Sequence, residues 1–126
     1  MPGSYQTIIN NSMYGDYAFV YFHSGNCSFC FGVLKILADE FPDILLISIT
    51  SANNFNLNDY YLEEISFRGI SLIDSTSLFR KSNQRLLEKM NLFLIDQNCN
   101  ILASSENLDD RIRNVIYRVI YNDTIK

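Results

Sequence analysis

The chain has 126 residues, of which 48% are hydrophobic and 19% charged, a composition typical of a globular protein and not of a disordered one. The net charge of −4 and the scattered basic residues argue against nucleic acid or an anionic membrane as the main partner. No apolar run approaches the ~20 residues that a membrane-spanning helix needs. We therefore expect a single domain over residues 1–126, with no membrane-spanning segment.

Hydrophobic periodicity predicts the elements of the first half of the chain. A short helix is expected over Ser4–Met13, and the nearly continuous apolar run Tyr17–Phe22 predicts a strand buried on both faces. From Cys27 the apolar residues recur with a helical period, which predicts a helix. This helix should end at Phe41, because Pro42 follows and the residue before a proline disfavours the helical conformation. A second buried strand over Ile44–Ile49 would complete a strand–helix–strand unit with a right-handed crossover.

The second half of the chain is predicted to add a hairpin and further helices. The expected elements are, in chain order, a helix over Asn58–Phe67, a strand over Ile70–Ile73, a helical turn through Arg80 capped by Asp74–Thr76, a β-hairpin formed by Leu92–Ile95 and Ile101–Ala103, and a last helix from near Ser105. This order indicates an α/β fold with a central mixed β-sheet flanked by helices.

Two of the three cysteines have C-x-x-C spacing, in Cys27-Ser28-Phe29-Cys30, directly after the first predicted strand and at the start of a predicted helix. A thiol in the first helical turn faces unpaired backbone N–H groups and the positive end of the helix dipole, which favour the thiolate. Because the thiolate is the nucleophile, Cys27 is the candidate attacking group. Cys30 can then close the ring that releases a mixed disulfide. Cys30 also heads an apolar helical stripe, so we expect it to be the more buried of the two.

Other readings of the cysteine pair stay open. A C-x-x-C pair can be half of a zinc site, which needs two further ligands, and His23 and Cys99 are the candidates. We expect Cys99 to lie roughly 20 Å away, because a strand of about six residues at ~3.3 Å each separates it from the site. A second alternative is a pair of structural thiols without turnover, since cysteine is often simply buried.

From Tyr17 to its end the chain resembles the thioredoxin superfamily, and more closely its TlpA-like thiol–disulfide oxidoreductases. The resemblance rests on the first strand, on the segment Phe22–Cys30, and on Leu92–Asp96 before a tight hairpin. It implies a thioredoxin-like fold, an exposed first cysteine as nucleophile and a second as resolver. It further implies a protein thiol or disulfide as substrate, a redox partner protein, no cofactor or metal, and a location in the periplasm or cell envelope, with the leader absent from this chain.

The sequence departs from the family pattern at four positions. Asn26 stands where an aromatic residue commonly precedes the first cysteine, and Tyr21 stands where thioredoxin has its buried proton-accepting carboxylate. Met90 replaces the cis-proline that guides the substrate, just before Asn91. A non-proline cis bond costs about 2.5–4 kcal/mol, so we expect a trans bond there. Cys99 stands near a family glycine, and we expect a surface thiol without a catalytic role.

Several residues around the cysteine pair are candidates for binding or proton transfer. The predicted substrate-binding residues are Asn26, Ser28, Phe29 and Met90. The only histidine, His23, is either a proton shuttle near Cys27 or a packed or capping residue. Glu63 and Glu64 are either a replacement carboxylate for the site or part of a solvated helix face.

Two functions from different classes follow from these residues. The first is a dithiol–disulfide oxidoreductase that acts by Cys27 attack and Cys30 resolution. The second is a catalytically weak thioredoxin-fold binding module, or a piece of a larger cell-envelope protein, whose cysteines do not turn over. The C-x-x-C pair at a helix start favours the first, and Met90 in place of proline favours the second. Metal binding by the two cysteines, permitted by the loss of that proline, is a weaker third hypothesis.

Overall fold

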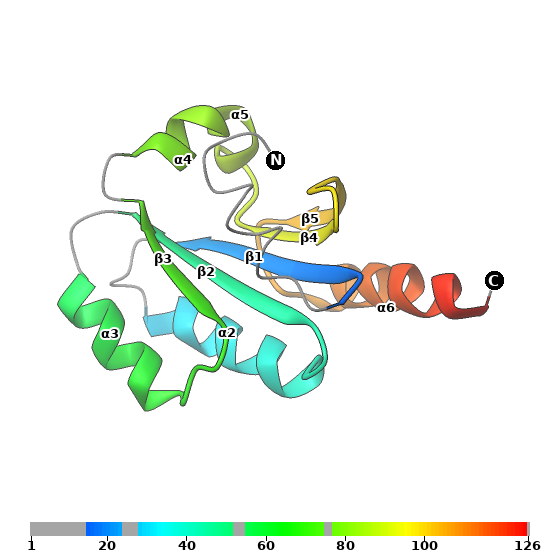
Figure 1. Ribbon diagram of the computed structural model, residues 1–126, viewed down its shortest axis with the longest axis horizontal. Coiled ribbons are helices and arrows are strands. Elements are labelled where there is room, and N and C mark those ends of the chain that lie inside the picture. The colour runs from blue at the N-terminus through cyan, green and yellow to red at the C-terminus, as the bar shows by residue number, and fades with distance from the viewer. Residues whose placement is uncertain (1–14, 24–27, 52–54, 75–76, 126) are drawn as a thin grey trace.

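The computed structural model describes residues 15–23, 28–51, 55–74 and 77–125, so the predicted helix Ser4–Met13 lies outside the described residues. Within them, five strands form one mixed sheet in the order β3-β2-β1-β4-β5 (Figure 1). The strands are β1 (Tyr17–His23), β2 (Leu45–Ser51), β3 (Ile70–Asp74), β4 (Leu92–Asp96) and β5 (Ile101–Ser105). The predicted fold class, an α/β fold with a central mixed sheet, is confirmed.

The strand directions bring several chain ends to one edge of the sheet. β1 pairs in parallel with β2, and β2 pairs in parallel with β3. β4 is antiparallel to both β1 and β5. The carboxyl ends of β1, β2 and β3 therefore meet at one edge, which we call the carboxyl edge. The start of β4 and the end of β5 lie at the same edge, because Leu92 pairs with both Tyr21 and Ser105.

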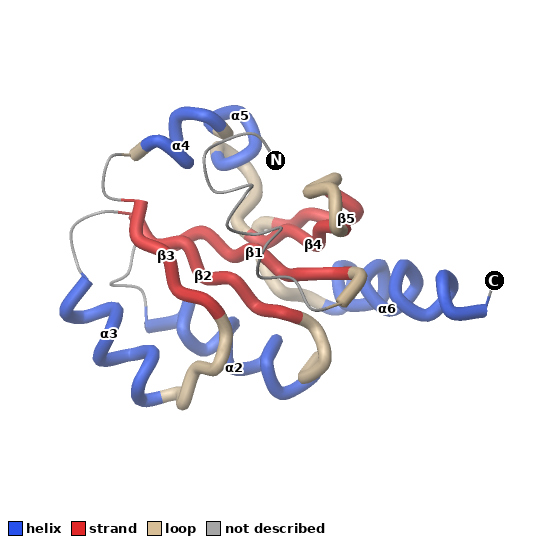
Figure 2. The backbone as a smooth tube through the Cα atoms, in the orientation of Figure 1, coloured by secondary structure: helices blue, strands red, loops and turns tan. Residues whose placement is uncertain are grey.

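Helices cover both faces of the sheet (Figure 2). They are α2 (Ser28–Glu40), α3 (Phe55–Glu64), α4 (Leu78–Ser82), α5 (Gln84–Leu87) and α6 (Asp110–Ile125). Side chains of α2, α3 and α6 pack into one core cluster, whereas Phe79 of α4 and Leu87 of α5 pack into the other. Within the described ranges, no helix combines the length and the apolar character needed to cross a membrane.

The apolar run of β1 follows from this two-sided packing. Phe19 and Tyr21 belong to the cluster under α2, while Ala18 and Val20 belong to the cluster under α4, and all four are buried. Successive side chains of a strand point to opposite faces, so a strand covered on both faces is apolar throughout. β1 is thus held rigidly in the middle of the sheet, and its end positions the segment that follows.

The helices differ from the periodicity in three places. α3 spans Phe55–Glu64, about one turn earlier at each end than the predicted Asn58–Phe67, and Asn58 in its first turn is buried and accepts a hydrogen bond from Thr50 of β2. α6 begins at Asp110 because Asp109 accepts a hydrogen bond from the backbone N–H of Ile112, which caps the helix. The connection after Ser82 contains the single-turn helix α5. Hydrophobic periodicity cannot reveal a helix that short.

The predicted cap of α4 is confirmed for Asp74. Its carboxylate, on a side chain only 1% exposed, accepts hydrogen bonds from the backbone N–H groups of Phe79 at 2.9 Å and Arg80 at 3.0 Å. Ser75 and Thr76 lie outside the described residues. Asp74 thereby satisfies two of the N–H groups that a helix start leaves unpaired.

Candidate active site

The candidate site lies where β1 passes to α2 at the carboxyl edge (Figure 1). Cys27 and Asn26 fall outside the described residues; in the sequence Cys27 directly precedes Ser28, the first residue of α2. Cys30 is the third helical residue and is partly buried against the core cluster under α2. The backbone N–H groups of a first helical turn have no intrahelical acceptor, so this position favours a thiolate.

The apolar stripe predicted for the helix is confirmed. Leu34, Leu37 and Phe41 are all at most 5% exposed and belong to the same cluster that Cys30 contacts. Cys30 is therefore fixed by the packing of its own helix. Phe29, one residue earlier, points the other way and is 67% exposed, as a substrate-contacting residue must be. The side chain of Ser28, another predicted contact, is not among those described.

His23, the last residue of β1, is packed into the protein. Its side chain is 5% exposed, its Nε2 lies 2.6 Å from the hydroxyl of Ser48, and its ring meets the ring of Phe31 edge to face at 5.0 Å. Burial lowers the pKa of His23 from 6.5 to about 4, because the charged imidazolium loses its hydration. The ring is therefore neutral at pH 7. The packed alternative matches this placement, and the proton-shuttle role stays a prediction.

The lowered pKa of His23 predicts a loss of stability in mild acid. The folded protein binds a proton on His23 less readily than the unfolded chain does. The contribution of neutral His23 to stability is therefore present above pH 6.5 and is lost as the pH falls toward 4. We expect the free energy of unfolding to fall by about 2 kcal/mol between pH 7 and pH 5 because of this residue. Urea unfolding at the two pH values measures it. The variant His23→Gln should lack most of this fall, and an equal fall in both proteins would contradict the assignment.

Tyr21, where the family resemblance would place a proton-accepting carboxylate, is a buried aromatic residue. Tyr21 is 4% exposed, stacks on the ring of His23 at 5.7 Å between centroids, and has its pKa raised by burial. Glu63 and Glu64 do not replace the carboxylate, since both are exposed near the end of α3, away from the carboxyl edge. Among the described residues, the only fully buried carboxylate is that of Asp74, which caps α4 on the other face.

Met90 and Asn91 lie beside the end of β1. The backbone N–H of Phe22 donates to the carbonyl of Asn91 at 2.9 Å, and the N–H of Asn91 donates to the carbonyl of Ser105 at 3.0 Å. Met90 is half-buried and packs against the cluster under α4. No cis peptide bond occurs in the described residues, so the expected trans bond before Met90 is confirmed.

The expectation of a surface thiol at Cys99 is wrong. Cys99 is 1% exposed in the cluster under α4, and burial raises the pKa of its thiol. Its φ of 60° lies in the left-handed region that favours glycine, the residue that the family resemblance leads us to expect near this position. Tyr17 pairs with Asp96, so the hairpin lies at the edge opposite Cys30. Cys99 therefore cannot complete a zinc site with the C-x-x-C pair.

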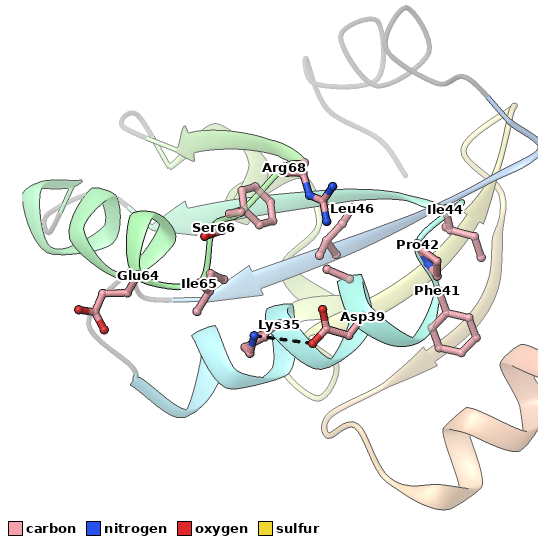
Figure 3. A pocket seen from close by; sticks show the side chains of 13 residues that line it. Lys35, Asp39, Phe41, Pro42, Ile44, Leu46, Glu64, Ile65, Ser66 and Arg68 are labelled. Atoms are coloured by element: carbon pink, nitrogen blue, oxygen red, sulfur yellow. Dashed lines mark ion pairs between the residues drawn. The ribbon is translucent and has the colours of Figure 1, made fainter.

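Two cavities differ in their relation to this site. A cavity of about 410 Å³ lies beside Met90 and Ser105, at the carboxyl edge, and its other lining residues are polar or charged. A second, of about 390 Å³, lies between the later turns of α2 and the α3–β3 connection, where Lys35 forms an ion pair with Asp39 (Figure 3). No cysteine or histidine lines the second cavity. No cysteine or histidine lines the first cavity either, but Met90, a predicted substrate-binding residue, is part of its wall.

Sequence analysis missed three buried polar residues behind the site, namely Ser48, Thr50 and Asn58. Each is at most 1% exposed. Ser48 and Thr50 interrupt the apolar run of β2 at alternate positions, which places both on the face covered by α2 and α3. This alternation of polar residues within an apolar strand was the sequence signal from which their shared face could have been predicted. Asn58 carried no signal of its own, because an asparagine near a helix start is usually exposed.

Comparisons with known proteins identify the fold. No protein-family model and no curated protein matches the chain. Among solved structures, the thioredoxin domain of a thiol-disulfide oxidoreductase from Bacteroides vulgatus has a TM-score of 0.65 at 17% identity, with 87% of this chain and 83% of that one covered. A thiol-disulfide oxidoreductase from Bacteroides fragilis gives 0.65 at 15% identity, covering 82% and 81%.

A third similar structure is a secreted disulfide oxidoreductase of Mycobacterium tuberculosis, homologous to Escherichia coli DsbE. It has a TM-score of 0.60 at 14% identity, with 77% of this chain and 73% of that one covered. At such identities the likeness shows the fold. The chain thus has the thioredoxin fold, with Cys30 in the first turn of α2 at the end of a central strand.

Proposed function

We propose that the chain is a thiol–disulfide oxidoreductase that acts on protein thiols or disulfides through Cys27 attack and Cys30 resolution. The observation that carries the proposal is the position of Cys30, half-buried in the first turn of α2, with Cys27 three residues earlier in the sequence. Helix-start thiols of this kind have lowered pKa values and are the reactive ones. The oxidoreductases with similar folds support the same function.

The two cysteines would exchange two electrons with the substrate in two steps. The Cys27 thiolate attacks one sulfur of a substrate disulfide, a mixed disulfide forms, and the other substrate sulfur leaves as a thiolate that takes up a proton. The Cys30 thiolate then attacks the sulfur of Cys27, and the second substrate thiol departs. The substrate disulfide is reduced and the cysteine pair is oxidised. The same steps in reverse oxidise a substrate dithiol, and a redox partner protein resets the pair.

Substrate contacts are proposed at the carboxyl edge. The exposed ring of Phe29 and the cavity beside Met90 lie on the two segments that flank the end of β1. Asn26 and Ser28 would complete this surface because they adjoin Cys27 in the sequence. We place the protein in the periplasm or cell envelope, since one of the similar oxidoreductases is secreted and homologous to DsbE.

A lowered pKa of the Cys27 thiol is the first expected result. Unpaired N–H groups at the start of α2 should hold it between about 3.5 and 7.5, compared with about 8.5 for an ordinary cysteine. The measurement is the rate of alkylation by iodoacetamide against pH on the reduced protein. The variant Cys27→Ser is the control, because it must remove the fast phase. A rate that rises only above pH 8 would contradict an activated nucleophile.

A redox titration of the cysteine pair tests the proposed function itself. Equilibration with glutathione buffers, followed by alkylation and mass measurement, gives the reduction potential. A reversible midpoint between about −120 and −270 mV, the range of known oxidoreductases, would support turnover and indicate its direction. A pair that stays oxidised below about −300 mV would be structural. If the two thiols never form a disulfide, metal binding becomes the better hypothesis. A zinc titration of the reduced protein then tests it.

Met90 favours a second candidate function, a binding module with little turnover. The peptide bond before Met90 is trans, and this methionine stands where the family resemblance implies a proline that guides the substrate. In that case a target protein would bind the carboxyl edge whether the cysteines are oxidised or reduced. Activity in an insulin-reduction or thiol-oxidation assay separates the two functions, since the binding module would show none.

A further inference from the structure

The cavity of about 390 Å³ between α2 and the α3–β3 connection opens at the edge of the sheet opposite the cysteine pair (Figure 3). Its walls come from the later turns of α2, the start of β2 and the residues just before β3. The parallel strands β2 and β3 begin at this edge, so we call it the amino-edge cavity. Its volume lies within the range of about 300–1,000 Å³ that is typical of small-molecule sites.

Apolar side chains form the inner wall of the amino-edge cavity. Leu46 of β2 and Phe41, directly after α2, are each 5% exposed. Ile44 and Phe67 are partly buried against the same core cluster. Ala38, on the exposed side of α2, lines the cavity with only a methyl group. Such a wall favours a ligand with an apolar body, because contact removes apolar surface on both sides from water.

The turn that ends α3 places Phe67 and Arg68 at this cavity. The backbone N–H of Ser66 donates to the carbonyl of Glu63 at 3.1 Å, and that of Phe67 donates to the carbonyl of Leu62 at 3.0 Å. This pair of bonds ends a helix with one residue in the left-handed conformation, here Ser66 with a φ of 53°. Glycine is the usual residue there, so the serine adds backbone strain. Strained residues of this kind are concentrated at ligand sites and functional switches.

Four charged side chains line the cavity, and three of them are already engaged. Lys35 Nζ lies 3.7 Å from Asp39 Oδ2, and Glu64 accepts a hydrogen bond from the hydroxyl of Tyr60 at 3.1 Å. Arg68 is exposed and forms no ion pair with any residue that the structure describes. Figure 3 shows the carboxylate of Glu64 pointing away from the guanidinium of Arg68. The N–H donors of Arg68 are therefore available to a ligand.

We propose that the amino-edge cavity binds a small organic acid, whose carboxylate is held by the Arg68 guanidinium and whose hydrocarbon part packs on the apolar wall. Arginine pairs with a carboxylate through two parallel N–H···O bonds, and this fixes the orientation of the ligand. The site is separate from the cysteine pair at the carboxyl edge. The inference therefore goes beyond the proposed oxidoreductase function and does not depend on it.

The two carboxylates at the cavity limit the charge of the ligand. Asp39 and Glu64 both line it, and both repel an anion. A doubly charged phosphate is repelled more strongly than a carboxylate, whereas one guanidinium neutralises a single charge. Lys35 is paired with Asp39 and offsets only that residue. The site should therefore select monocarboxylates over phosphate esters.

Titration with 3-phenylpropionate, followed by two-dimensional ¹H–¹⁵N NMR spectroscopy, tests this proposal. We expect saturable shifts of the backbone amide signals of Arg68 and Gly69, with a dissociation constant of about 1 mM or lower. The uncharged analogue 3-phenylpropan-1-ol should bind at least about tenfold more weakly, because it cannot form a charge-assisted pair with arginine. The phosphate ester of this alcohol should also bind more weakly than the acid.

Three variants connect the binding to the cavity. Arg68→Gln should weaken the binding of 3-phenylpropionate at least about tenfold. Arg85→Gln is the matched control, because Arg85 is an exposed arginine of α5 and does not line this cavity. It should bind the acid as tightly as the unmodified chain. Ala38→Phe places a ring in the cavity from the exposed side of α2 and should abolish saturable binding.

Several outcomes would overturn the proposal. They include the absence of saturable shifts at millimolar 3-phenylpropionate, equal binding of the acid and the alcohol, and tighter binding of the phosphate ester. A loss of affinity in Arg68→Gln no larger than in Arg85→Gln would overturn it as well. Arg68 is exposed, so its variant should fold, and the unchanged amide signals of the sheet verify this. A failed redox titration of the cysteine pair would not alter any of these results.

Discussion

A chain carrying Cys30→Ser is expected to accumulate as a covalent mixed disulfide with its substrate, and its turnover should be lost completely. Cys27 can still attack, but the thiolate that resolves the intermediate is gone, so the second step cannot occur. The position of Cys30 in the first turn of α2 is what makes it the resolving residue. Incubation with a disulfide-containing protein, followed by non-reducing electrophoresis and mass measurement, detects the adduct.

The matched variant for this trapping experiment is Cys27→Ser. It removes the nucleophile, so it should form no adduct and show no turnover, although Cys30 is still present. The contrast between the two variants assigns attack and resolution separately. Adducts that form equally well in both variants would mean that Cys30 is itself the exposed nucleophile, and the proposed order of the two steps would then be wrong.

Gly69→Ala is expected to destabilise the fold by about 3 kcal/mol, at the upper end of what overpacking usually costs. Gly69 lies in the connection from α3 to β3, where the backbone passes close to β2. A Cβ at this position would overlap the main-chain carbonyl of Leu46 and press on the ring of Phe67. The carbonyl belongs to a central strand and cannot give way. Urea unfolding followed by circular dichroism measures the change.

The control for this substitution is Gly32→Ala, which should act in the opposite direction. Gly32 is an exposed residue of α2, and a Cβ there would have no heavy atom within 4 Å. Alanine in a helix interior is more stable than glycine by about 0.5–1 kcal/mol, so this variant should be slightly stabilised. Destabilisation by both variants would show that the close approach at Gly69 is not the cause of its effect.

Strands were the most predictable part of this fold. Tyr17–Phe22 and Leu92–Ile95 are apolar because both faces of the sheet are covered, and both correspond to observed strands. The short helices α4 and α5 were harder, since a single turn contains too few residues for a helical period to be visible. Asp74 was still recognisable because a cap is a local side-chain feature.

The candidate site was only partly predictable. The C-x-x-C spacing after an apolar strand located the cysteine pair, since that signal is local in the sequence. The buried hydrogen bonds behind the site were not found, because they join His23 to Ser48 and Thr50 to Asn58 across separate elements. Cys99 was misplaced for a similar reason. Its burial depends on how the hairpin folds back over the core, and the left-handed conformation at that residue has no sequence signal except in glycine.

The enclosure of Cys99 has a practical consequence for every thiol assay on this protein. A reagent added to the reduced native chain cannot reach a side chain that is 1% exposed, so labelling under native conditions leaves Cys99 out of the count. Labelling after denaturation counts all three. The difference between the two counts should equal one for as long as the chain stays folded. The third cysteine is therefore a built-in reporter of unfolding, and no mutation is needed to use it.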